Sequence, residues 1–419
     1  MAKWTRSLVA LGLAAVVMAA GCGRDDSDGP TGPGRSIGDG PATGEITVWA
    51  MGTEGEKLSV LADAFMKENP DAKVTVTPIP WDGAHDKIAT AIAGRQTPDV
   101  SLVGTTWMGE FAGTGGLDPT PADLVDKDAF FPGAWDTTVV DGTSHGVPWY
   151  VETRLLYVNK AVAARAGITN APTTWEELKS ALTALRTRGG AKWAVSLPPG
   201  GPGSWQAVLP FVWQNGGDVR ADGAFTLDRP ETVEALTYYR SFFDEGLAPK
   251  DLAQGALEPG FVKGEIGAFV SGPWHIGILK EQGAGDNFQL WHMPRRKAAT
   301  SFVGGGNLAV FSDAKNRAGA WKFVSYLSRP DVQVTWYRTA SDLPSVKRAW
   351  EDPVLRDDPQ LRAFGAQLED AKSPPAIATW EQVAAGLESE IERLTRTGVS
   401  PQDAAREMQR KATAIGAGS

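Results

Sequence analysis

The sequence predicts an α/β protein of two lobes with a hinge and a cleft between the lobes, and three observations support this prediction. Residues 45–103 alternate strand, helix, strand, helix, strand, and a second alternating series follows between residues 155 and 293. The extended segment Gly146–Lys160 joins the two series. Its fifteen residues would span about 50 Å, which is too long for one ordinary strand. We therefore expect two strands, one in each lobe.

The middle of this segment is a polar triplet, Glu152-Thr153-Arg154, between two apolar halves. A charged pair inside an apolar run is costly unless hydrogen bonds satisfy it. Ligand hydroxyls in a cleft between the lobes would satisfy Glu152 and Arg154. An internal ion pair or a solvated strand edge would explain the triplet equally well.

Composition narrows the class of protein. The chain has 419 residues, enough for two or three domains, and its 42% apolar and 22% charged residues are typical of a soluble globular protein. With 41 Lys and Arg against 50 Asp and Glu and no basic cluster, nucleic acid is not an expected partner. The 16 Trp against 6 Tyr would suit a carbohydrate cleft, although some of the excess can be core packing.

The first residues are predicted to be a targeting segment. Leu8–Ala20 is a 13-residue apolar run, the length of a signal-peptide core. The small residues before Cys22, the only cysteine, resemble the lipobox of bacterial lipoproteins, which implies cleavage after residue 21 and a lipid on Cys22. Ordinary secretion with a chance cysteine is the alternative. Residues 22–44 are rich in Gly and Pro, and we expect a flexible tether.

The first alternating series predicts a parallel sheet. Its expected elements, in order, are a strand at 46–50, a turn at 51–55, a helix at 56–69, a strand at 74–78, a helix through 88–92 and a strand at 100–103. Ligands of such sheets bind at the carboxyl ends of the strands. The residues predicted there are Glu54, Trp81, Asp82, Thr106 and Trp107, each of which could also be only part of a turn.

The second series predicts the other lobe. Thr174 and Glu177 form a capping-box pattern before a helix to Thr187. The other expected elements are helices at 159–167, 208–214 and 230–246 and strands at 193–197, 264–270 and 288–293. Trp205 and Trp274 follow Pro/Gly loops, so we expect them in the cleft, with lobe core as the alternative. Three glycines at 304–306 precede a strand at 308–311, and the expected elements after it are helices at 317–328 and 333–339 and a helical end from 353.

Signatures of catalysis and metal binding are not found. The sequence has no P-loop, HExxH or CxxC motif, and its four histidines are scattered. A glycosidase needs two facing carboxylates. Glu54 and Glu152 could form such a pair, or could instead accept hydrogen bonds from sugar hydroxyls. We predict no enzyme activity, no metal and no cofactor.

Several stretches together resemble the extracellular solute-binding protein family 1, the maltose-binding-like proteins of bacterial ABC sugar importers. The resemblance covers nearly the whole mature chain. It is carried by GRQTPDV (94–100), GGLDP (115–119), VPWYVETRLLYVNK (147–160), PTTWEEL (172–178), FVWQNGGDV (211–219), VKGEIGAFVSGPW (262–274), and GGGNLAV with AWKFVSYL (304–327).

The resemblance implies a type II periplasmic-binding-protein fold with three crossings, near residues 150–153, 294–301 and 341–345. It implies an N-terminal lobe of 45–150 plus 300–343 and a C-terminal lobe of 154–297 plus 345–419. The positions that match the family's cleft contacts are Glu54, Trp81, Thr106, Trp107, Glu152, Arg154, Trp205, Gln214, Trp274, Gly305 and Asn307.

The resemblance also implies a function. We expect a monomeric lipoprotein on the extracytoplasmic face of the cell membrane that captures an oligosaccharide or disaccharide and delivers it to an ABC permease with its cytoplasmic ATPase. Two rival interpretations remain open: the same fold binding a non-sugar solute, and a cell-surface polysaccharide-degrading enzyme.

Overall fold

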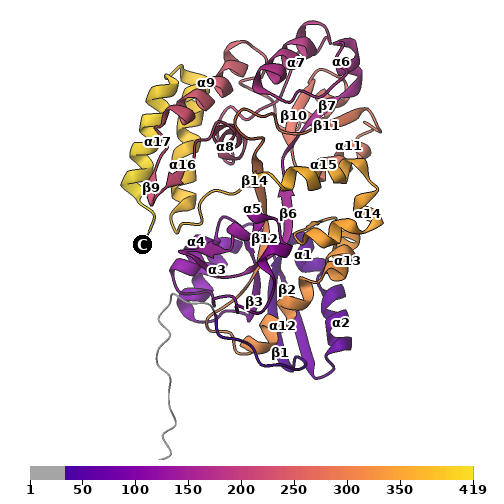
Figure 1. Cartoon of the computed structure of the whole chain (residues 1–419), viewed down its shortest axis with the longest axis vertical. Helices are drawn as coiled ribbons and strands as arrows, with labels where there is room; N and C mark the ends of the chain where they lie inside the picture. Colours follow the sequence, from indigo (N-terminus) through magenta and orange to yellow (C-terminus); the bar gives the residue numbers. More distant parts are fainter. Residues whose placement is uncertain (1–33, 419) are drawn as a thin grey trace, which may run out of the picture.

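The computed structural model describes residues 34–418, and they form two lobes stacked along the long axis of the molecule (Figure 1). A seven-stranded sheet organises the N-terminal lobe and a three-stranded sheet organises the C-terminal lobe. The predicted signal peptide and Cys22 lie outside the described residues. Within residues 34–418, no helix has both the length and the apolar character needed to cross a membrane.

The large sheet has the strand order β13-β6-β12-β3-β1-β2, with β14 added beside β12. β1 pairs in parallel with both β2 and β3, so the predicted βαβαβ unit is confirmed. The elements up to the first crossing are β1 (Gly44–Met51), α1 (Gly52–Lys57), α2 (Ser59–Glu68), β2 (Ala72–Ile79), α3 (Ala84–Gly94), β3 (Val100–Gly104), α4 (Met108–Gly113), η1 (Lys127–Ala129), α5 (Pro132–Asp136), β4 (Val139–Val140), β5 (Thr143–Ser144) and β6 (Val147–Thr153).

One expectation for this lobe is wrong. The predicted turn at 51–55 is mostly helix, because α1 begins at Gly52 directly after β1. The glycines suit this close junction: a Cβ on Gly55 would lie 2.3 Å from the backbone oxygen of Ala50. The helix therefore depends on small residues rather than on local helix propensity.

The small sheet has the order β10-β7-β11, with both outer strands antiparallel to β7. The capping box of Thr174 and Glu177 is confirmed at the start of α7. Up to the second crossing the elements are β7 (Leu155–Asn159), α6 (Lys160–Arg165), α7 (Trp175–Thr187), α8 (Trp205–Gln214), β8 (Arg220–Ala221), β9 (Ala224–Phe225), α9 (Pro230–Asp244), α10 (Leu257–Val262), β10 (Ala268–Ser271), α11 (Trp274–Glu281) and β11 (Phe288–Trp291).

The predicted strand at 193–197 does not form. Only isolated bridges join this segment to β10 and the residues just before it, at Trp193 with Ile266 and Ser196 with Phe269. Conversely, the strand expected at 308–311 is much longer, because β12 begins at Ser301. From there the elements are β12 (Ser301–Val310), α12 (Arg317–Leu327), α13 (Pro330–Ala340), β13 (Leu343–Pro344), η2 (Lys347–Glu351), α14 (Pro353–Arg356), α15 (Pro359–Leu368), β14 (Ala371–Lys372), α16 (Trp380–Glu392), η3 (Arg393–Thr397) and α17 (Pro401–Ile415).

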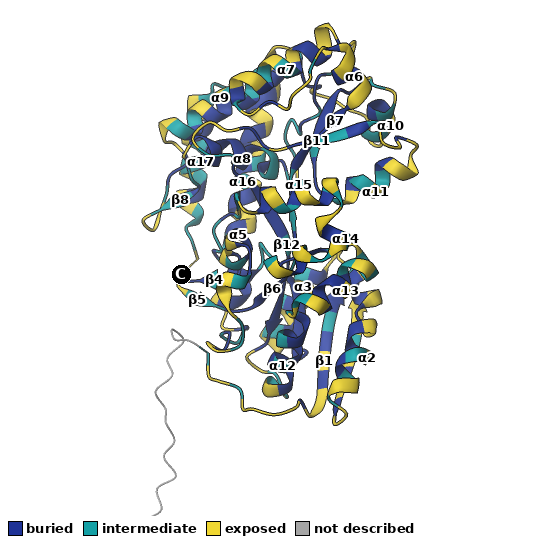
Figure 2. Ribbon diagram, turned by 45° about the vertical axis from the view of Figure 1, so that its right-hand side comes forward, coloured by how far each residue is buried: buried dark blue, intermediate teal, exposed yellow. Residues whose placement is uncertain are grey.

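Gly146–Lys160 is two strands in two different sheets, as its length predicts. β6 ends at Thr153 in the large sheet, and β7 begins at Leu155 in the small one. β12 runs antiparallel to β6 across the same boundary, pairing Gly304 with Glu152. Figure 2 shows buried residues along β6, β12 and β7. The polar triplet therefore lies at the junction of the lobes.

Two stretches outside the expected bounds of the N-terminal lobe contact it. Val346 packs in the core of that lobe, beyond residue 343. The segment from residue 34 to residue 44, expected to be part of a flexible tether, lies on the same lobe: Ala42 is buried, and its N–H donates to Asn69 Oδ1 at 2.8 Å. Residues 34–44 are too polar to form a core of their own. Hydrogen bonds to side-chain acceptors and a few small apolar contacts hold them on the N-terminal lobe.

Candidate functional site

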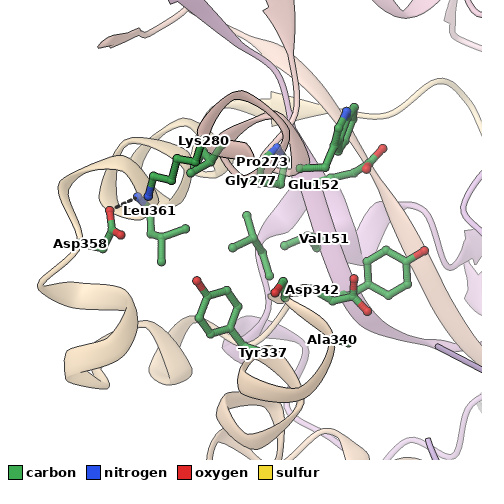
Figure 3. Close-up of a pocket in the computed structure, with 15 residues that line it drawn as sticks. Val151, Glu152, Pro273, Gly277, Lys280, Tyr337, Ala340, Asp342, Asp358 and Leu361 are labelled. Carbon is green, nitrogen blue, oxygen red and sulfur yellow. Dashed lines mark hydrogen bonds between the residues drawn. The ribbon is translucent and has the colours of Figure 1, made fainter. Parts of the chain in front are cut away.

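A pocket of about 370 Å³ lies between the lobes beside the first crossing (Figure 3). In Figure 3, Glu152 and Asp342 lie at one side of this pocket and Lys280 and Asp358 at the other. Both lobes contribute to its wall. The lining residues are Tyr150, Val151, Glu152, Tyr337, Ala340, Ser341, Asp342 and Leu343, together with Pro273, Trp274, Ile276, Gly277, Lys280, Asp358 and Leu361.

The ion pair of the polar triplet lies at this pocket. Arg154 Nη2 donates to Glu152 Oε1 at 3.1 Å and to Gln206 Oε1 at 3.0 Å. The guanidinium also lies over two aromatic rings, Trp274 at 4.7 Å and Phe302 at 5.1 Å from the ring centres. Its Nη1 is buried without a hydrogen-bond partner. Arg154 thus links the two strands of the crossing to the indole of the C-terminal lobe and keeps donor capacity for an acceptor.

Three carboxyl groups meet at the N-terminal side of the cleft. Burial raises the pKa of Glu54, and the nearby charge of Glu152 raises it further. Burial, together with the charges of Glu54 and Glu152, raises the pKa of Asp342 to about 8. Asp342 Oδ2 accepts from Trp336 Nε1 at 3.0 Å. These carboxyls offer many acceptor sites for hydroxyl groups in a weakly hydrated place.

An aromatic wall flanks the carboxyl groups on the N-terminal lobe. Trp81 and Trp107 pack edge to face with ring centres 5.8 Å apart. Trp81 is exposed. A Cβ on Gly52 would lie 2.9 Å from the Trp81 ring and 3.5 Å from the Glu54 carboxylate, so the indole and the carboxyl are close neighbours. Asp82 is exposed and Thr106 is half-buried beside this wall.

A family model described as bacterial extracellular solute-binding protein matches residues 50–334. The chain belongs to this family.

Individual relatives agree with this membership. The diacetylchitobiose binding protein DasA of Streptomyces coelicolor is 28% identical over 96% of both chains. The sugar-binding protein MalE of Xanthomonas citri has a similar structure, with a TM-score of 0.84 and 32% identity over 89% of this chain and 97% of that one. The GacH receptor of Streptomyces glaucescens, solved alone and with acarbose, gives a TM-score of 0.75 and 26% identity over 89% and 98%. These neighbours share the maltose-binding-protein-like two-lobed architecture.

Three of the expected contacts lie in the interior of this solute-binding protein. Trp205 is 5% exposed and packs edge to face on Trp380 at 5.1 Å. Gln214 is fully buried, donating to the Thr300 backbone at 2.9 Å and accepting from a tryptophan N–H. Asn307 is buried and donates to Thr137 Oγ1 at 2.9 Å. In this conformation their polar atoms are used inside the lobes.

The remaining expected contacts come together. Glu152, Arg154 and Trp274 meet at the pocket, and Glu54, Trp81 and Trp107 form the adjacent face. Gly305 lies in β12 with φ 126°, and a Cβ there would lie 2.2 Å from the backbone oxygen of Tyr150. Its lack of a side chain therefore allows β12 to approach β6 at the crossing.

Sequence reasoning missed several cleft residues, including the pocket-lining Lys280, Tyr337 and Asp358. Gln206 and Asp342 are two further examples. Gln206 follows Trp205 in α8 and reaches Arg154, and Asp342 lies within the third crossing. The expected crossing near residues 341–345 was the available signal for Asp342. Gln206 had no such signal in the sequence, because a single polar residue at the start of a helix is common.

Proposed function

We propose that the protein is the substrate-binding component of an ABC importer and captures an oligosaccharide or disaccharide between its lobes. The observation that carries the proposal is the pocket between lobes where Trp274, Glu152 and Arg154 meet. Sugars present apolar C–H faces that suit an indole and hydroxyl groups that suit a carboxylate and a guanidinium. The sugar-binding relatives support the same ligand class.

The proposed cycle is a hinge motion. A ligand that contacts both lobes favours the closed form by its differential affinity for it. The closed form would dock on a membrane permease whose cytoplasmic ATPase drives import. We further propose that the protein acts as a monomer at the extracytoplasmic face of the membrane, held there by lipid on Cys22, with the lobe boundaries given by the three crossings.

Calorimetric titration with a panel of sugars tests the proposal. We expect saturable binding of at least one disaccharide or oligosaccharide, with stoichiometry near one. Absence of binding to every sugar, combined with binding of a polyamine, peptide or metal ion, would favour a non-sugar solute instead. Release of reducing ends from a polysaccharide over hours would favour an enzyme.

Trp274→Ala is expected to weaken sugar binding about tenfold. Burying about 60 Å² of sugar C–H surface on the indole contributes roughly 1.5 kcal/mol at 25 cal/mol/Å². Titration calorimetry with the best sugar of the panel measures the change. Because Trp274 is 42% exposed, the fold should survive, and the melting temperature without ligand checks this. Unchanged affinity in a folded Trp274→Ala variant would remove this indole from the site.

A further inference from the structure

A buried chain of hydrogen bonds lies directly behind Trp274 and is not part of the pocket wall. Ser271 Oγ lies 2.6 Å from His275 Nδ1, and His275 Nε2 lies 3.1 Å from Glu258 Oε1. Ser271 and His275 are both buried. The three residues come from β10, the first turn of α11 and α10, so the chain ties together the elements on either side of Trp274.

The Glu258 carboxylate fixes the direction of one hydrogen bond, and in a neutral imidazole it also sets the direction of the other. A carboxylate oxygen only accepts, so His275 Nε2 carries the hydrogen that faces Glu258. In the neutral ring, Nδ1 then has a lone pair and accepts from the Ser271 hydroxyl. Glu258 thereby selects the tautomer that satisfies Ser271. Without an acceptor at residue 258, the ring could carry its hydrogen on Nδ1, and the serine hydroxyl would lose its acceptor.

The order Ser271–His275–Glu258 is that of a hydrolase triad, but two features argue against a nucleophile. The serine faces Nδ1, whereas in serine hydrolases it faces Nε2. Ser271 is also only 6% exposed, so no substrate carbonyl can reach it. The chain of hydrogen bonds therefore has a positioning role.

What it positions is the segment from Ser271 to Trp274. Tyr157 Oη donates to the backbone oxygen of Gly272 at 2.6 Å. A Cβ on Gly272 would lie 2.0 Å from the Trp274 ring, so the indole packs directly against this glycine. His275 follows Trp274 directly, and its ring is held at both nitrogens. Glu258, a residue of α10 outside the pocket wall, thus holds the side chain that directly follows the cleft indole.

We propose that Glu258, His275 and Ser271 form a positioning unit that sets the Trp274 indole for ligand stacking. This inference rests on the proposed function. Glu258→Ala is expected to weaken sugar binding about 3- to 10-fold, the loss of roughly one hydrogen bond's contribution. Glu258→Gln should restore nearly all of it, because the carboxamide oxygen still accepts from Nε2–H. Ser271→Ala, a smaller change at the other end, should weaken binding in the same direction.

Two measurements test the proposal. In the first, tryptophans are replaced by 5-fluorotryptophan, and the ¹⁹F resonance of Trp274 is assigned with Trp274→Phe. We expect this resonance to shift or broaden in Glu258→Ala and in Ser271→Ala, and to stay in place in Glu258→Gln and in the control His292→Gln, which removes an exposed histidine of the same lobe. A Trp274 resonance that does not move in either alanine variant would overturn the proposal.

The second measurement is a double-mutant cycle by calorimetric titration with maltotriose and with diacetylchitobiose. If Glu258 acts through Trp274, the loss caused by Glu258→Ala should vanish in the Trp274→Ala background. An equal fold-loss in both backgrounds would contradict the positioning role. Failure of both sugars and of the whole panel to bind the unmodified protein would count against the proposed function, while the ¹⁹F result would still decide whether the unit holds Trp274.

Discussion

Asp342→Asn is expected to raise the free energy of unfolding at pH 9 by several kcal/mol. The pKa of Asp342 rises from 3.8 to about 8 in the folded protein, mainly through burial and then through the charges of Glu54 and Glu152. The folded state therefore binds this proton more tightly than the unfolded state does. The stabilisation is fully present below pH 3.8 and is lost as the pH rises through about 8, with a ceiling of roughly 6 kcal/mol.

Asparagine removes the charge but keeps an oxygen that can accept from Trp336 Nε1. Urea unfolding at pH 4.5 and pH 9 measures the difference, which should be small at the lower pH and large at the higher one. The control is Asp82→Asn, an exposed carboxyl of the same lobe, for which we expect a change within about 0.5 kcal/mol at both pH values. A stability difference between Asp342→Asn and the unmodified protein that does not depend on pH would contradict this account.

Gly305→Ala is expected to cost about 4 kcal/mol or more, or to prevent folding. At φ 126° an L side chain is strained, and the added methyl group would lie 2.2 Å from the backbone oxygen of Tyr150. Neither backbone can withdraw easily, because β12 and β6 are paired on both sides of this position. The yield of folded protein and the urea midpoint measure the effect.

Gly277→Ala is the matched control for this change. Gly277 also lines the pocket, but it lies inside α11, and a Cβ there would meet nothing within 4 Å. Alanine is the better helix former, so stability should rise by up to about 1 kcal/mol. A folded Gly305→Ala variant as stable as Gly277→Ala would show that the crossing tolerates a side chain.

Local sequence pattern was sufficient for most of the fold. The alternation of apolar residues predicts the ends of β1, β2 and β3 to within two residues, and the Thr174–Glu177 spacing predicts the start of α7. The α1 helix could not be predicted in this way, because its glycines oppose helix formation locally. The glycines of α1 are necessary because the helix packs against the end of β1. Such a contact cannot be read from the order of residues in the sequence.

The site residues that could be predicted are those that differ in polarity from their neighbours in the sequence. Glu152 and Arg154 interrupt an apolar run, and they do lie at the junction of the lobes. Trp205 and Gln214 did not differ in pattern from the residues that reach the pocket, although they are buried. Asp342 shows the opposite case. Its raised pKa depends on Glu54 and Glu152, which are far away in the sequence and meet it only in the folded protein.

The stretch from residue 34 to residue 44 has a mechanical consequence. Its contacts, including Arg317 Nη2 to the backbone oxygen of Arg35 at 2.8 Å and Asn316 Nδ2 to that of Thr43 at 2.7 Å, are all with the N-terminal lobe. Any force applied through the preceding residues is therefore transmitted to the N-terminal lobe only. If those residues are attached to a surface, the N-terminal lobe stays fixed relative to the surface. The C-terminal lobe then rotates about the hinge each time a ligand binds or dissociates.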